Sequence, residues 1–171
     1  MSERELPDQC EKYAAFAQVI LDKAKQRGGG DEREISSLLC DCHHNQSISA
    51  LYTGTPGAMD HAKLWLALLI DRIEKWNLPS DALNLATSYN QLALCYIKVD
   101  IVEEAINSWR VSFDTYRGLE SAPKLSGVWP ATSLGLIYSL ENRPEEGNEI
   151  LEPILRDREE VFGKDDTSTS E

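Results

Sequence analysis

Apolar residues return every three or four positions along almost the whole chain, which is the period of an α-helix with one buried face. The first such stretch, "QCEKYAAFAQVILDKAKQR", is predicted to form a helix that ends at the glycines of residues 28–30. Its apolar stripe contains Tyr13, Phe16, Ala17, Ile20, Leu21 and Ala24. Sustained alternation of a strand is absent from the sequence, so the pattern predicts an all-α fold.

Turn-forming and capping residues mark the ends of further helices. The second helix is predicted from Asp31, a candidate N-cap, to about Tyr52, before the turn "GTPG". The third, "AMDHAKLWLALLIDRIEKW", ends at "NLPSD", where Pro79 breaks it and Ser80 or Asp81 can cap the next helix. Helices four and five meet at "KVDI". Helices six and seven meet at "ENRP", whose proline suits a first turn, so the pattern predicts about seven helices.

Two stretches match each other with an offset of 42 residues, the distance from Leu92 to Leu134. The matched pairs are Leu92 and Leu134, Ala93 and Gly135, Tyr96 and Tyr138, Ala105 and Gly147, and Trp109 and Leu151. Small residues let two antiparallel helices approach closely, and the large residues fill the groove between that pair and the next. The chain is therefore expected to contain at least two repeated helix pairs.

This order of large, Leu-small, Tyr, small and aromatic positions resembles the tetratricopeptide repeat. The spacing of 42 residues exceeds the usual length of about 34 and is similar to the variant in kinesin light chains and in fungal and bacterial signalling proteins. The stretch "ILEPILRDREEVFGKDDTST" resembles the linker that leads into a further repeat of that variant. The resemblance implies an α-α superhelix of antiparallel helices and a chain taken from a longer array.

The resemblance also suggests how the chain is divided. Tyr52, His61 and Trp65 precede Tyr96, Ala105 and Trp109 by 44 residues, so residues 31–80 are predicted to form a degenerate repeat. Residues 1–30 would be an N-terminal capping helix. Residues 81–122 and 123–163 would be the two well-matched repeats. Residues 164–171 are predicted to be a disordered tail or a truncated linker.

Charge and composition restrict the classes of partner. The 171 residues suffice for one domain or a short solenoid. The net charge of −12 would repel phosphate backbones, so no nucleic-acid partner is expected. The start lacks the apolar core of a secretory signal, and no apolar run is long enough for a membrane span. The sequence therefore predicts a location in the cytoplasm, or in the nucleus, and no membrane partner. The four cysteines are accordingly expected to be reduced thiols.

One cluster has the residue types of a metal or catalytic site. In "CDCHH", a helix would place Cys40, His43 and His44 on one face, where they could hold zinc with a further ligand from Cys10 or His61. The alternative places Cys40 or Cys42 in the core and the histidines at the surface. The acidic pairs Glu103-Glu104 and Glu145-Glu146 open helices, where negative charge is favourable without any catalytic role. The prediction is therefore no metal, no cofactor and no enzymatic activity.

The resemblance implies a ligand-binding concave face lined by the first helix of each pair. The positions that correspond to it are Thr87, Asn90, Gln91, Leu94, Ile97, Trp129, Thr132, Ser133 and Leu136. None is Lys or Arg, which argues against the carboxylate clamp of the cochaperone members. Asn90 and Gln91 would fix the backbone of a peptide or amphipathic helix, and Leu94, Trp129 and Leu136 would receive its side chains.

The function expected from this face is a non-catalytic protein-interaction module. One alternative is that the same residues pack against a neighbouring repeat or subunit. Another is a homodimerisation module, in which the same groove or the last helix, Glu145 to Phe162, docks on a second copy. A third is a metal-binding or enzymatic helical domain that uses Cys40, His43 and His44.

Overall fold

The computed structural model describes residues 5–120 and 122–163, without the side chains of residues 5–11, 13 and 14. Within these residues the fold consists of seven helices and no strand, so the all-α prediction is confirmed. The helices are α1 (Glu5–Gln26), α2 (Glu32–Thr53), α3 (Ala58–Lys75), α4 (Asp81–Lys98), α5 (Val102–Gly118), α6 (Val128–Leu140) and α7 (Pro144–Phe162). The expected tail, residues 164–171, and the predicted ligand Cys10 lie outside this description.

The predicted helix ends agree with the structure at most positions. Asp31 is the N-cap of α2, and its carboxylate accepts a hydrogen bond of 2.9 Å from the Arg33 amide. Gly54 ends α2 in the left-handed region with φ 71°, which glycine adopts without strain. Pro144 opens α7 as expected. Ser80 occupies the N-cap position of α4, but its side chain makes no capping hydrogen bond there.

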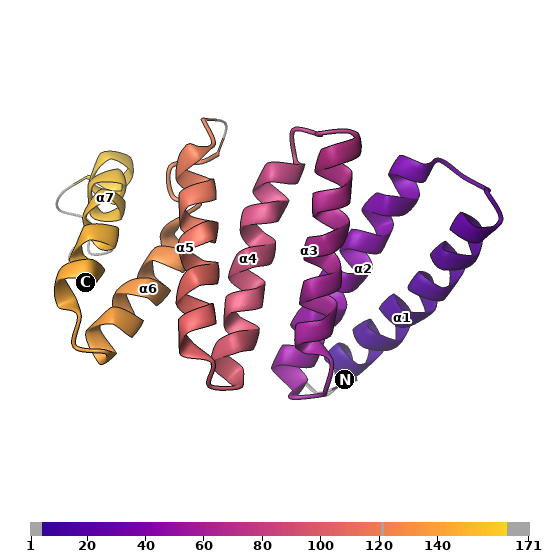
Figure 1. Cartoon of the computed structure of the whole chain (residues 1–171), viewed down its shortest axis with the longest axis horizontal. Helices are drawn as coiled ribbons and strands as arrows, with labels where there is room; N and C mark the ends of the chain where they lie inside the picture. Colours follow the sequence, from indigo (N-terminus) through magenta and orange to yellow (C-terminus); the bar gives the residue numbers. More distant parts are fainter. Residues whose placement is uncertain (1–4, 121, 164–171) are drawn as a thin grey trace.

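The helices follow one another in a row, with α1 at one end and α7 at the other (Figure 1). Each helix packs against the next one along the chain, and α2 also contacts α4. The core is divided along this row. A large cluster joins α4 to α7 through Ala93, Ala105, Trp109, Leu134, Tyr138 and their neighbours. Two smaller clusters lie around Trp65 and around Ala62.

The small residues of the two matched stretches are buried where one helix packs against the next. Ala93 and Ala105 are fully buried between α4 and α5. A Cβ atom on Gly135 of α6 would come within 2.6 Å of Leu151 Cδ1 in α7, a distance that real Cβ contacts do not show. A Cβ atom on Gly147 would lie 3.4 Å from the Gly135 carbonyl oxygen. The predicted reason for small residues at these positions is confirmed.

The upstream match between the stretches holds less well. Trp65 and Trp109 are both buried, as expected. Tyr96 is half-buried and Tyr138 fully buried, whereas Tyr52 is 83 % exposed, so Tyr52 does not pack as its predicted equivalent Tyr96 does. His61 lies beside His43, and its neighbour Ala62 is the residue that is fully buried.

A buried ion pair closes the turn between α3 and α4. Arg72 Nη2 donates to Asp81 Oδ1 at 2.9 Å, and both side chains are almost completely buried. Asp81 Oδ2 accepts a second hydrogen bond, 3.2 Å long, from the Leu78 amide. Asp81 therefore stabilises the turn that precedes α4 and binds an arginine of α3, a role that the sequence pattern did not indicate.

The apolar stripe of α1 is only partly covered. Ala17, Leu21 and Ala24 are half-buried, but Phe16 and Ile20 are exposed. The only helix that α1 packs against extensively is α2, so one side of its stripe has no neighbour among the described residues. The prediction of an amphipathic helix is confirmed, but its apolar side exceeds the surface that α2 covers.

Candidate functional site

Two polar residues of the predicted face on α4 bind α5. The Thr87 hydroxyl lies 2.8 Å from the Tyr116 hydroxyl, and it donates to the Leu83 carbonyl oxygen at 3.0 Å. Asn90 Oδ1 accepts a hydrogen bond of 3.1 Å from Trp109 Nε1. Both side chains are half-buried. Their known contacts hold α4 against α5, and only part of each side chain is open to a ligand.

Gln91 lies inside the molecule. Its side chain is buried, and Nε2 donates to Ser47 Oγ of α2 at 3.2 Å. The expectation that Gln91 fixes a partner's backbone is therefore not supported by its position, and we leave Gln91 out of the proposed surface. Leu94 is exposed, while Ile97 packs against the large core cluster.

The strongest candidate surface lies on α6. Trp129, Leu136 and Leu140 are 75 %, 62 % and 72 % exposed, and Thr132 between them is exposed as well. Their spacing places them on one side of the helix. We call these four residues the α6 face. Ser133 is half-buried at its edge.

The sequence of α6 explains why this face is apolar. The helix, VWPATSLGLIYSL, contains no charged residue. Its opposite side is fully buried through Ala131, Leu134 and Tyr138. A helix that is apolar all round is normally covered on every side, and an exposed apolar surface of this kind usually marks an interface. Leu140 was missed in the sequence because it follows the last ligand position of the repeat, although it continues the i, i+4 spacing from Leu136.

The cysteine and histidine cluster does not converge. Cys40 packs in a core cluster with Trp65 and Leu69. His44 stacks on Trp65, with ring centroids 4.0 Å apart. His43 points elsewhere and places its Nδ1 3.1 Å from His61 Nδ1. Among the described residues no group of three or more His, Cys, Asp or Glu side chains is arranged to hold a metal ion.

The alternative interpretation of this cluster is correct for the cysteines and wrong for His43, and His44 is only half-exposed because it stacks on Trp65. Cys40 and Cys42 are both buried, as it expected. His43, expected at the surface, is buried between α1 and α3, with Gln18 Nε2 3.3 Å from its Nε2. Burial, together with the neighbouring His61, lowers the pKa of His43 below its usual value.

The described cysteines are poor nucleophiles. Burial raises the pKa of Cys40 to about 11, although Arg72 opposes this shift. Burial also raises the pKa of Cys42 and of Cys95. The raised pKa keeps these thiols largely protonated at neutral pH. They react poorly because the thiolate is the reactive form.

Glu146, the second residue of the acidic pair that opens α7, is part of a surface ion-pair network. Glu146 Oε1 accepts from Arg143 Nε at 2.6 Å, and its other oxygen also contacts Arg110 at 3.3 Å. Arg110 and Arg143 in turn lie over the Tyr138 ring. These contacts give Glu146 a structural role, as its place in the first turn of the helix predicted.

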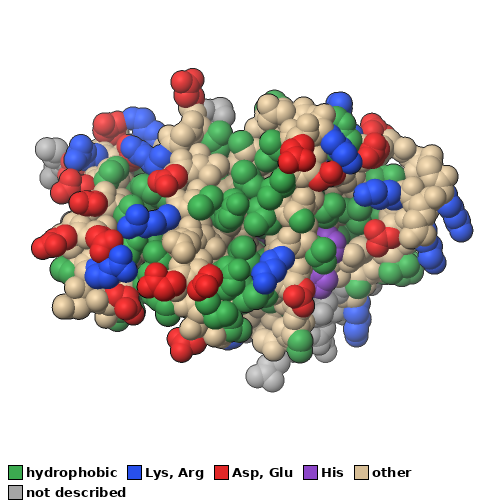
Figure 2. Space-filling view, viewed as in Figure 1, with side chains coloured by type: hydrophobic (Ala, Val, Ile, Leu, Met, Phe, Trp, Pro, Cys, Tyr) green, Lys and Arg blue, Asp and Glu red, His purple; other side chains and the backbone are tan. Residues whose placement is uncertain are grey.

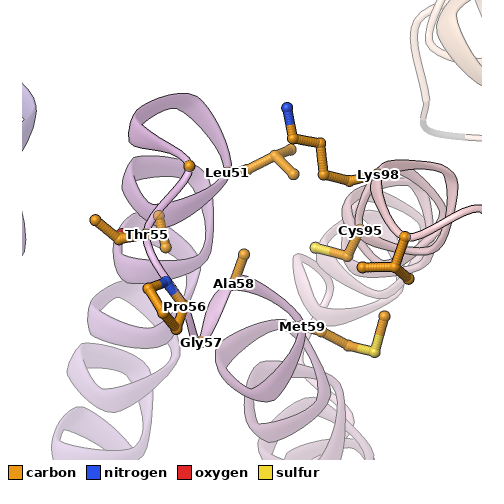
Figure 3. A pocket seen from close by; sticks show the side chains of 11 residues that line it. Leu51, Thr55, Pro56, Gly57, Ala58, Met59, Cys95 and Lys98 are labelled. Atoms are coloured by element: carbon orange, nitrogen blue, oxygen red, sulfur yellow. The ribbon is translucent and has the colours of Figure 1, made fainter.

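An open pocket of about 260 Å³ lies between the α2–α3 turn and the end of α4. Figure 3 shows the Cys95 sulfur pointing toward this hollow, while the Lys98 amine points away from it. The other lining residues come from the turn, such as Pro56 and Gly57, and from the adjoining ends of α2 and α3, such as Leu51 and Met59. The pocket is smaller than most ligand sites, and none of the nine predicted face residues lines it.

No described helix is both long and apolar enough to cross a membrane. No protein-family model, curated protein or solved structure matches this chain. The α6 face is therefore interpreted from its own residues.

Proposed function

We propose that the chain is a tetratricopeptide-like helical array that acts as a non-catalytic protein-interaction module, with the α6 face as its binding surface. The observation that carries the proposal is the exposure of Trp129, Leu136 and Leu140 along one side of a helix that has no charged residue. Large apolar side chains gathered in this way are the usual anchors of a protein interface, and tryptophan is enriched among residues that contribute most to binding.

The chemistry of the face favours an amphipathic helix or an extended peptide with apolar anchors. Hydrophobic side chains of such a ligand would cover Leu136 and Leu140 and lie against the indole of Trp129. Lys and Arg on the ligand's polar side would be attracted by the net charge of −12. Leu94, the predicted anchor on α4, is exposed as well.

The polar candidates for catalysis support the non-catalytic proposal. Cys40 and His44 pack against Trp65 of α3, whereas His43 contacts Gln18 of α1 and His61 of α3, so the three side chains do not meet at one point. Burial also keeps the Cys40 thiol protonated. A nucleophile needs a base within hydrogen-bond reach, and this cluster does not provide such a pair.

The proposal is tested with helical peptides selected from a display library for binding to the wild-type protein. The library would carry apolar residues at i, i+4 and i+7 and Lys or Arg elsewhere. Fluorescence anisotropy would then give Kd for the wild type and for Leu136→Glu, Leu140→Glu. Because both substitutions place charge at the anchors, we expect Kd to rise about a hundredfold.

The matched control is Leu64→Glu, which places a charge on an exposed leucine of α3. This variant should bind the selected peptides like the wild type. Peptides that bind the α6 variant and the wild type equally well would show that the α6 face is not the binding surface.

A further inference from the structure

The outer side of α1 combines apolar and basic residues. Phe16, Val19 and Ile20 are exposed, and Lys12 and Lys23 lie above and below them on the same side of the helix. We call these five residues the α1 face. Phe16 is 67 % exposed, which is unusual for a phenylalanine in the middle of a long helix. The α1 face thus has an apolar centre flanked by positive charge.

The outer side of α7 has the complementary composition. Glu152, Leu155, Glu159 and Phe162 follow one another at intervals of three and four residues, and all four are exposed. We call them the α7 face. Leu155 and Phe162 are 44 % and 50 % exposed. The α7 face therefore has apolar residues interleaved with negative charge.

The C-terminal part of α1 with the residue after it and the whole of α7 carry opposite net charge, although Glu5, Asp8 and Glu11 make the first turns of α1 acidic. From Lys12 to Arg27 the chain has four basic residues and one acidic residue. In α7 seven acidic residues stand against two arginines. Lys12, Lys23 and Glu159 form no ion pair with another described residue, so their charges are open to an external partner, whereas Glu152 pairs with Arg156 on its own helix.

The two faces cannot meet within one molecule, because α1 and α7 form opposite ends of the row (Figure 1). Figure 2 shows Lys and Arg side chains along the α1 end, and many Asp and Glu side chains with some Arg and Lys at the α7 end. We propose that the chain associates head to tail, with the α1 face of one copy docked on the α7 face of a second copy. Each added copy leaves one face of each kind open, so assembly continues unless the rotation closes a ring.

The test is light-scattering mass over a concentration series for three proteins. The average molecular mass of the wild type should increase with protein concentration, and this increase should become smaller as the salt concentration is raised. Phe16→Glu, Ile20→Glu blocks the α1 face, and Leu155→Glu, Phe162→Glu blocks the α7 face. All four positions are exposed, so both variants should keep the helical circular dichroism of the wild type.

Mixing the two variants distinguishes this interface from a symmetric one. Each variant alone should remain a monomer, with Kd for association raised about a hundredfold. An equal mixture should form dimers and nothing larger, because it contains one intact α1 face and one intact α7 face. The wild-type mass should be unchanged by Leu136→Glu, Leu140→Glu, which separates this proposal from the one for the α6 face.

Three results would overturn the proposal. A wild type that stays monomeric at every concentration would mean that the α1 and α7 faces do not bind each other. An α1-face variant that still associates alone would indicate a symmetric contact between α7 helices. Loss of association in the α6 variant would place the contact on α6.

Discussion

Gly135 allows α6 and α7 to approach each other because it has no side chain. Substitution by alanine would bring a Cβ atom within 2.9 Å of Leu151 Cγ as well as 2.6 Å from Cδ1. Gly135→Ala should gain about 1 kcal/mol in helix propensity and lose about 1–3 kcal/mol by overpacking. We expect a net fall in the free energy of unfolding, measured by urea denaturation.

The control for this substitution is Gly118→Ala at the end of α5, where the added methyl group meets nothing within 4 Å. That variant should stay within about 0.5 kcal/mol of the wild type. Equal stabilities of the two variants would contradict the packing role of Gly135. Adding Leu151→Ala to Gly135→Ala should cost less than the two single changes together, because the clash is then removed.

His43 makes the stability of the chain depend on pH. Its pKa is lowered in the folded state by burial first and by His61 second, while Asp22 of α1 opposes the shift. His44 also has a lowered pKa because of burial, with Asp41 opposing. Below the ordinary histidine pKa of about 6.5 the unfolded chain therefore binds more protons than the folded chain. The free energy of unfolding should fall as pH is lowered, by at most about 1.4 kcal/mol per pH unit for each proton.

Urea denaturation between pH 7.5 and 5.0 measures this slope above the range in which most carboxylates titrate. His43→Gln should reduce the slope, whatever its effect on stability at pH 7.5. A slope that is the same in His43→Gln and the wild type would assign the pH dependence to other groups.

At the scale of elements, the turn between α3 and α4 depends on the ion pair of Arg72 and Asp81. Asp81→Ala would leave the buried Arg72 guanidinium without its carboxylate, which should cost about 3–5 kcal/mol. Asp81→Asn should lose less, because the amide oxygen still accepts a hydrogen bond. Thermal or urea unfolding measures both changes.

The surface pair of Lys75 and Glu32 provides the comparison, with 3.3 Å between its charged atoms. Glu32→Ala should change the free energy of unfolding by less than about 1 kcal/mol. If Asp81→Ala were as mild as Glu32→Ala, the buried pair would not be essential for the α3–α4 turn.

Helix positions could be predicted from the sequence because their signals are local. Asp31, Gly54 and Pro144 mark ends that depend on backbone geometry at one residue, and all three are where the pattern placed them. The buried Arg72 and Asp81 could not be predicted, because their pairing depends on how α3 and α4 meet. Only the packed helices reveal that contact.

The candidate surface was partly predictable for the same reason. Trp129 and Leu136 were identified from the repeat resemblance, and both are exposed. Gln91 occupies an equally plausible position by spacing, yet α2 covers it and Ser47 binds its amide. Exposure depends on the distance between neighbouring helices, which no single stretch of sequence contains.

At the scale of the whole molecule, the two proposals use different parts of the row. The α6 face is an uncharged apolar surface beside the largest core cluster. The α1 and α7 faces are charged and lie at the ends. Head-to-tail association would therefore leave the α6 face of every copy open and would present several copies of it along one assembly, which raises avidity for a repeated ligand.

Ligand binding at the α6 face can be followed through the indole N–H signals of the tryptophans. In an ¹H–¹⁵N spectrum, the indole signal of Trp129 is assigned as the one that disappears in Trp129→Phe. Adding a selected peptide should shift the Trp129 signal, because this indole is exposed, and should leave the buried Trp65 and Trp109 signals in place. A peptide that binds the protein but leaves the Trp129 signal unchanged would show that the α6 face is not the binding surface.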